Sequence, residues 1–84
     1  MADRRIIGQR IREVRQLRGI SQQWLARRAG ISKQAMYAIE TGEVDPRATR
    51  IIDIAKALRV STDYLLGVKD HEDLSEPRRV FALV

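Results

Sequence analysis

Apolar residues recur at helical spacing in the N-terminal part of the chain. Ile7, Ile11 and Val14 stand three or four residues apart, so they would share one face of an α-helix. Gly19 follows this pattern, and glycine commonly ends a helix because it adopts the left-handed conformation without strain. The pattern predicts a first amphipathic helix over about residues 5–18.

Three further helices are predicted from a combination of signals that repeats along the chain. A serine would cap the first turn, an apolar residue before it would pair with one in the second turn, and a glycine follows the last turn. Agreement between these signals makes each prediction more specific than helix propensity alone. The sets are Ile20, Ser21, Leu25 and Gly30 for a helix over about 22–29, Ile31, Ser32, Met36 and Gly42 for a helix ending near residue 40, and Val60, Ser61, Leu65 and Gly67 for a helix over about 62–66.

One more helix is predicted over about residues 47–58, after a turn at 43–46. Aromatic residues make up only 5% of the sequence, and runs of β-branched residues are few, so strands are not favoured. The expected fold is all-α, a compact bundle of five helices. The inward face of the fourth helix would hold Ala48, Ile51, Ala55 and Leu58.

The amino-acid composition of the chain changes after Gly67. We expect one domain over residues 1–68 and a C-terminal tail over residues 69–84, which is polar and acidic until an apolar run from Val80 to Val84. An apolar run is costly to leave in water. Three alternatives stay open: the run packs back on the bundle, it pairs with its counterpart in a second subunit, or the chain is a piece of a longer regulator.

The net charge is +5, and the basic residues are concentrated in the predicted domain. Residues 1–69 hold 14 of the 16 lysines and arginines but only 7 of the 11 aspartates and glutamates. A compact basic body is typical of a protein that binds a polyanion, although many small proteins are basic as well.

Other classes of function find no support in the sequence. The absence of cysteine excludes a disulfide framework and a thiolate metal site, and the lone His71 in the acidic tail predicts no metal site either. No nucleophile is paired with a base and no phosphate-binding loop occurs, so we expect neither an enzyme nor a cofactor. The sequence has no signal peptide and no stretch long enough to span a membrane, which favours a cytoplasmic protein.

The second and third predicted helices have the layout of a helix-turn-helix. Their connection, Gly30-Ile31-Ser32, is short enough for a sharp turn, and the helix that follows would present Lys33, Gln34 and Tyr37 to solvent. In such motifs the second helix enters the major groove of DNA. The alternative is an ordinary pair of helices within a bundle.

Several stretches make the pattern more specific, and they resemble the lambda-repressor-like, Cro-like helix-turn-helix family (regulators of the xenobiotic-response-element type). The resemblance covers roughly residues 6–67 and implies a five-helix bundle, binding to double-stranded operator DNA and a two-fold homodimer. The stretches are Ser21-Gln22-Gln23-Trp24-Leu25-Ala26, Ala29-Gly30-Ile31-Ser32, Ile39-Glu40-Thr41-Gly42, Pro46, residues 54–61 and Asp63-Tyr64-Leu65-Leu66-Gly67.

The resemblance also implies roles for individual residues. Those implied to read bases are Lys33, Gln34, Tyr37 and Ala38. Gln34 suits adenine, and Lys33 suits guanine or, alternatively, contacts a phosphate only. Tyr37 would contact a thymine methyl or a phosphate, or it would shield the edge of the domain. Those implied to contact phosphates are Gln22, Ser32, Thr41, Arg47 and Arg50. Arg15 and Glu40 would form a structural ion pair between the first and third helices. Dimerisation or packing of the tail would involve Tyr64, Leu66, Val80, Phe81 and Leu83.

Three residues depart from the family pattern. Ala38 stands where a polar base-reading residue is common, and Glu43 stands where a basic residue often binds phosphate. Trp24 occupies a surface position, where it would pack on the first helix or the tail, or form part of an interface. The expected function is a transcriptional regulator of the repressor type. The alternatives are an antitoxin or restriction-modification controller with an unidentified protein partner, and a protein-interaction adaptor that does not read DNA.

Overall fold

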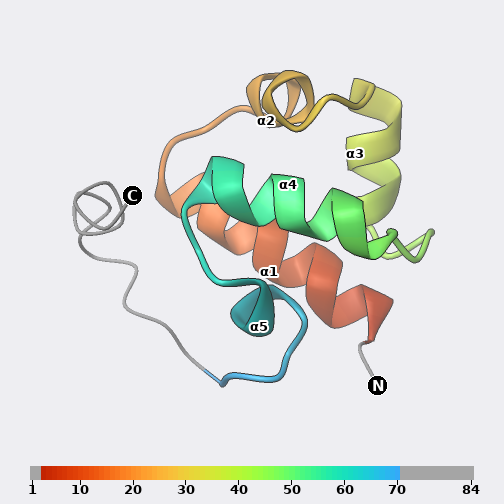
Figure 1. Ribbon diagram of the computed structural model, residues 1–84. Helices are drawn as coiled ribbons and strands as arrows, with labels where there is room; N and C mark the ends of the chain where they lie inside the picture. The colour runs from red at the N-terminus through yellow and green to blue at the C-terminus, as the bar shows by residue number, and fades with distance from the viewer. Residues whose placement is uncertain (1–2, 71–84) are drawn as a thin grey trace.

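The computed structural model describes residues 3–70, which form an all-α bundle of five helices (Figure 1). This confirms the predicted fold class and the position of each helix. The helices are α1 (Arg4–Leu17), α2 (Gln22–Ala29), α3 (Lys33–Glu40), α4 (Ala48–Leu58) and α5 (Thr62–Leu65). Of the predicted tail, only residues 69 and 70 belong to the described part, so Val80, Phe81 and Leu83 lie outside it.

Helix α1 is the centre of the bundle, where it contacts α3, α4 and α5. Helix α2 packs against α3 and α4, and the short α5 closes the bundle against α1 and α4 (Figure 1). The largest side chains in the core are fully buried, and they come from all five helices: Ile7, Ile11, Val14, Leu25, Met36, Ile39, Ile54, Leu58 and Leu65.

The predicted serine caps are present at all three helix starts. The hydroxyl oxygens of Ser21, Ser32 and Ser61 accept hydrogen bonds from backbone amides three residues on, at 3.0, 3.0 and 3.1 Å. Each bond satisfies an amide that has no partner within the helix. Gly30 follows α2 with φ +75°, so the short connection between α2 and α3 rests on a conformation that glycine adopts freely.

The inward face of α4 differs from the prediction. Ala48 is exposed, and the buried residue that the prediction left out is Ile54, which is fully buried. Ala48 is the first residue of α4 and lies beyond the edge of the core, whereas Ile54 continues the buried stripe from Ile51. Helix α4 ends at Leu58 and is followed by Arg59, which has φ +60°, whereas a glycine follows the other predicted helices.

Two arginines, one on α1 and one directly after it, bind the carboxyl ends of other helices. Arg18 Nε donates to the carbonyl oxygen of Leu58 at 2.7 Å, at the end of α4. Arg10 Nη1 donates to the carbonyl oxygens of Tyr64 and Lys69, both at 2.5 Å, and its guanidinium lies 4.4 Å from the centroid of the Tyr64 ring. Cations are favourable at helix C-termini because the last carbonyl groups carry partial negative charge.

We expect Arg18→Met to lower the free energy of unfolding by about 1–2 kcal/mol, because it removes a charge-assisted hydrogen bond while keeping the aliphatic part of the side chain. Urea denaturation followed by circular dichroism measures the change. The matched control is Arg4→Met, at an exposed position at the start of α1. Equal stabilities of the two variants would show that the contact with Leu58 contributes nothing.

Helices α1 and α3 cross at Gly8. A Cβ atom at this position would lie 2.3 Å from the carbonyl oxygen of Ile39 and 2.7 Å from that of Glu40. These distances are far below van der Waals contact, and the nearby atoms belong to the backbone. Gly8 therefore sets how closely α3 approaches the centre of the bundle.

Candidate nucleic-acid interface

The outward face of α3 carries the residues implied to read bases. Lys33, Gln34 and Tyr37 are exposed, and Ala38 is half-buried beside them. They border one shallow groove together with one residue from the start of α2 and one from the turn after α3. The lining residues are Gln22, Lys33, Gln34, Tyr37, Ala38 and Glu43. The structure thus brings all four of the predicted base-reading residues onto one surface.

Two further depressions adjoin this groove, and they hold most of the residues implied to contact phosphates. Gln22 and Thr41 border one depression, between α1, α2 and α3. Arg47 and Arg50 border the other, between α3 and the start of α4. Ser32 is exposed at the N-terminus of α3, where its hydroxyl already accepts the capping bond from the amide of Ala35.

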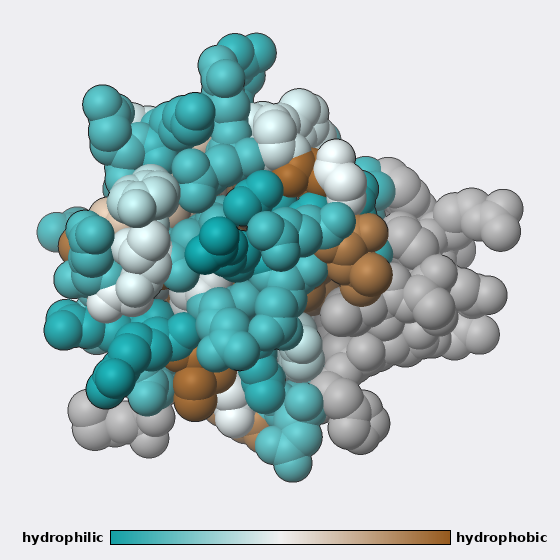
Figure 2. Space-filling view, turned by 180° about the vertical axis from the view of Figure 1, so that it is seen from behind, coloured by the Kyte–Doolittle hydropathy of each residue, from teal (hydrophilic) through white to brown (hydrophobic). Residues whose placement is uncertain are grey.

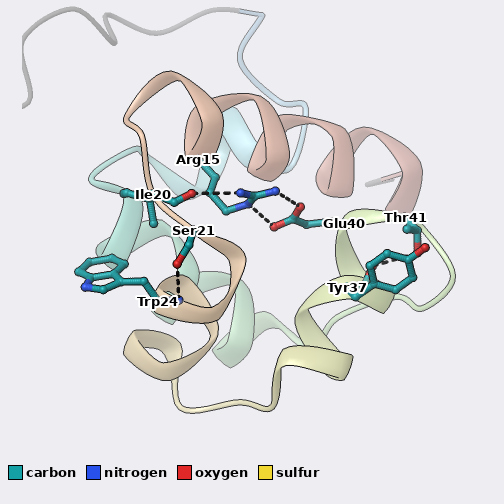
Figure 3. A network of polar contacts seen from close by, with 7 residues as sticks. All are labelled: Arg15, Ile20, Ser21, Trp24, Tyr37, Glu40 and Thr41. Atoms are coloured by element: carbon teal, nitrogen blue, oxygen red, sulfur yellow. Dashed lines mark hydrogen bonds and ion pairs between the residues drawn. The ribbon is translucent and has the colours of Figure 1, made fainter.

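A buried ion pair fixes α3 to α1, as the resemblance implied. Arg15 Nε donates to Glu40 Oε2 at 2.8 Å, and Arg15 Nη2 donates to Glu40 Oε1 at 3.0 Å. The side chains of Arg15 and Glu40 are only 13% and 2% exposed. Arg15 Nη1 also donates to the carbonyl oxygen of Ile20 at 3.0 Å, so one guanidinium joins α1, α3 and the connection before α2 (Figure 3). This two-bond geometry restrains both the position and the rotation of α3.

The hydroxyl of Thr41 is engaged within α3. Thr41 Oγ1 lies 3.0 Å from the carbonyl oxygen of Tyr37 and 3.2 Å from that of Ala38, and it is the donor to both. The side chain therefore satisfies carbonyl groups at the end of α3. Thr41 is an exposed residue, and it lies beside Tyr37 (Figure 3).

Trp24 is 46% exposed, and its ring lies 5.7 Å from the guanidinium carbon of Arg28 on the same helix. Figure 3 places Trp24 on α2, at the opposite side of the view from Tyr37 on α3, so these two exposed aromatic residues do not form one surface. An interface at Trp24 stays a prediction. Elsewhere, the face seen in Figure 2 is largely hydrophilic, with hydrophobic side chains in small separate patches.

Of the residues predicted for dimerisation or tail packing, the structure describes Tyr64 and Leu66, and their role stays a prediction. Tyr64 is only 8% exposed and belongs to the core, so most of its ring is unavailable to a partner subunit. The reason is that α5 packs its first turn against α1, where Arg10 covers the ring. Leu66 is half-buried against the core.

Two residues at the interface received no binding role from the sequence. Arg12 borders the same depression as Gln22 and Thr41. Glu43 borders the groove of the base-reading residues, and its backbone amide donates to the carbonyl oxygen of Ala38 at 3.0 Å, which fixes it to the end of α3. The sequence offered one signal for Arg12, its spacing from Arg15. Arg12 precedes Arg15 by about one helical turn, so both residues lie on the same side of α1.

Within residues 3–70, no three His, Cys, Asp or Glu side chains gather closely enough to hold a metal ion. None of the helices in that part of the chain combines the length and apolar character needed to cross a membrane.

A bundle in which a short turn joins a supporting helix to an exposed, polar second helix defines a helix-turn-helix domain. The model of the helix-turn-helix family matches residues 11–65. The chain therefore belongs to this family, and its solved relatives place it among the lambda-repressor-like domains.

Curated relatives include regulators from bacteria and a phage. The chain is 40% identical over 67 residues to an uncharacterized transcriptional regulator in the ATPase CF(0) region of Rhodospirillum rubrum, covering 80% of this chain and 62% of the relative. It is 36% identical over 61 residues to repressor protein C2 of Salmonella phage P22, covering 73% of this chain and 28% of that protein. The chain thus spans less than two thirds of the length of the Rhodospirillum relative.

Solved structures agree with this assignment. The restriction-modification controller protein C.AhdI from Aeromonas hydrophila superposes with a TM-score of 0.72 at 32% identity, covering 75% of this chain and 96% of the controller. The P22 c2 repressor protein, solved in complex with a synthetic operator, superposes with a TM-score of 0.71 at 35% identity, with the same coverage.

Proposed function

We propose that this chain is a sequence-specific DNA-binding transcriptional regulator of the repressor type. It binds a near-palindromic operator as a homodimer and acts by occupying DNA that polymerase needs. This function places the protein in the cytoplasm, on the nucleoid. It involves no catalysis.

One observation carries the proposal: α3 presents Lys33 and Gln34 from its N-terminal turn, on a helix whose position is fixed by a buried ion pair. The major groove of B-DNA admits one α-helix, and the first residues of a recognition helix lie nearest the base edges. Gln34 has the donor and acceptor that pair with adenine, and Lys33 donates to guanine. The P22 c2 repressor, which shares the fold, was solved in complex with an operator.

The residues around α3 supply contacts that position the domain without reading sequence. Gln22 and Thr41 border the depression between α1, α2 and α3, and Arg47 and Arg50 border the one between α3 and the start of α4. Phosphate contacts on both strands would flank the helix in the groove and provide most of the affinity. In a two-fold dimer, the two copies of α3 would stand about 34 Å apart, which is one turn of DNA.

The experiment that tests the proposal is selection of bound sequences from random duplex DNA with the purified chain. The expected result is a near-palindrome with two half-sites separated by about one helical turn. Weak binding that depends on salt but recovers no motif would contradict the proposal. It would favour the protein-interaction adaptor instead.

We expect Arg47→Ala to weaken binding to all duplexes by a similar factor, because phosphate contacts carry no sequence information. In plots of the logarithm of affinity against that of salt concentration, the slope should fall by about 1. Fluorescence anisotropy over a range of salt concentrations measures this. Arg27→Ala is the control, since Arg27 lies outside the three depressions around α3. An unchanged slope in Arg47→Ala would contradict its phosphate role.

A second candidate is a restriction-modification controller, which also binds DNA. The observation that favours it is the superposition with C.AhdI, of which 96% is covered. An antitoxin is the related alternative, in which half-exposed Trp24 would contact the protein partner. Isolation of the tagged protein from its native host separates these functions, because only an antitoxin would bring a toxin with it.

A further inference from the structure

The depression between α1, α2 and α3 is unusual because a charged side chain of α1 borders it. It is lined by Arg12, Arg15, Gln22, Tyr37, Glu40 and Thr41. Arg15 and Glu40 neutralise each other through two hydrogen bonds, so neither is free to bind a ligand. Arg12 is then the cationic group that remains on this surface.

Arg12 has no structural task within the part of the chain that the structure describes. Its side chain is exposed, and within residues 3–70 its guanidinium makes no hydrogen bond or ion pair. The guanidinium groups of Arg10 and Arg15 on this helix, and of Arg18 just after it, donate hydrogen bonds to other elements. A planar guanidinium matches the oxygens of a phosphate and binds them through two parallel donors.

The depression is continuous with the groove that holds the base-reading residues. Gln22 and Tyr37 border both of them. When α3 occupies the major groove, a depression beside it faces the sugar-phosphate backbone along the groove's edge. The ligand that fits an exposed arginine there, next to an amide and a hydroxyl, is therefore a DNA phosphate.

The turn after α3 cannot supply a phosphate contact from its side chain. Glu43 occupies this turn, and its carboxylate would repel a phosphate. In the described residues, the Glu43 carboxylate has no hydrogen bond or ion pair that would neutralise it. Positive charge beside the end of α3 has to come from a neighbouring helix, and Arg12 on α1 is placed to provide it.

We infer that Arg12 binds a DNA phosphate in this depression, with Gln22 and Thr41 as its neutral neighbours. The inference rests on the proposed DNA-binding function and adds α1 to the elements that hold the backbone. It assigns the phosphate contact beside α3 to the central helix of the bundle. Because α1 is joined to α3 by the Arg15–Glu40 pair, the contact and the base-reading helix would move as one body.

The test compares Arg12→Ala and Arg12→Lys with the wild-type chain on two duplexes, the selected operator and a scrambled sequence of the same length. Each affinity is measured at several salt concentrations. For Arg12→Ala, the expected result is an affinity about five- to tenfold lower on both duplexes and a salt slope smaller by about 0.9, which is one phosphate. Arg12→Lys should keep the slope, because it keeps the charge.

The matched control is Lys56→Ala, which removes the same charge from a depression between α2 and α4 that shares no residue with those around α3. It should change affinity less than twofold. Equal affinities and slopes in Arg12→Ala and Lys56→Ala would overturn the inference. If selection gives no operator but Arg12→Ala still lowers the slope on scrambled DNA, base reading fails while the phosphate contact stands.

Discussion

Gly8→Ala is expected to destabilise the domain by about 2–3 kcal/mol, the cost of forcing an extra carbon into a packed interior. Helix propensity alone predicts the opposite result, because alanine is favoured over glycine inside a helix by about 1 kcal/mol. The structure decides between these effects, since the added Cβ would lie 2.3 Å from the carbonyl oxygen of Ile39. Backbone atoms cannot rotate away as a side chain does, so α1 and α3 would have to separate.

Urea denaturation of Gly8→Ala measures this change in the free energy of unfolding. Gln16→Ala is the control, because Gln16 is an exposed residue of the same helix. It should alter stability by no more than about 0.5 kcal/mol. If Gly8→Ala were as stable as the wild type or more so, the close crossing of α1 and α3 would be wrong.

Glu40→Ala is expected to destabilise the domain by about 3 kcal/mol, because it leaves the charge of Arg15 buried without its partner. The side chain of Arg15 is only 13% exposed, so water does little to replace the lost carboxylate. The variant should also bind DNA more weakly, because α3 loses the contact that fixes its orientation. Replacing both residues, as in Arg15→Met with Glu40→Met, should cost much less than the sum of the single changes Arg15→Met and Glu40→Met.

Thermal and chemical unfolding of the two single variants and the double variant provide the coupling energy. Glu43→Ala serves as the control for loss of a carboxylate, because Glu43 is exposed. It should change stability by about 0.5 kcal/mol or less. Additive effects of the two single changes, or a cost for Glu40→Ala as small as that for Glu43→Ala, would contradict a structural role for the pair.

The positions of the helices were predictable because their signals are local. The hydroxyls of Ser21, Ser32 and Ser61 accept bonds from amides three residues away, and such contacts depend on neighbouring sequence alone. The end of α4 had no such signal. There Arg59 adopts φ +60°, a conformation for which glycine or asparagine is the usual indicator.

Contacts between distant segments were harder to predict. The burial of Tyr64 depends on how α5 packs against α1, and the bond from Arg18 to Leu58 joins residues 40 positions apart. Gly8 gave a signal, since a glycine inside a helix often marks a close approach, but sequence alone does not say which backbone lies opposite. The Arg15–Glu40 pair was predicted only through the family resemblance.

In the candidate site as well, local features were predictable from the sequence and contacts between distant segments were not. The spacing of Lys33, Gln34 and Tyr37 on one helix face follows from helical periodicity, so their common exposure was predictable. The approach of Arg12 to Gln22 and Thr41 depends on the packing of three helices, which no local pattern specifies. Glu43 was noted as a departure from the family, but its place beside the base-reading residues required the structure.

The most direct test of base reading by α3 is the base preference of Gln34→Ala on the selected operator and its single-base variants. The matched control is Gln23→Ala, which removes the same side chain from an exposed position of α2. The account predicts that Gln34→Ala loses about 1–3 kcal/mol of discrimination at one position in each half-site, while Gln23→Ala keeps the wild-type preference. An unchanged preference in Gln34→Ala, or a uniform loss of affinity at every position, would contradict base reading by α3.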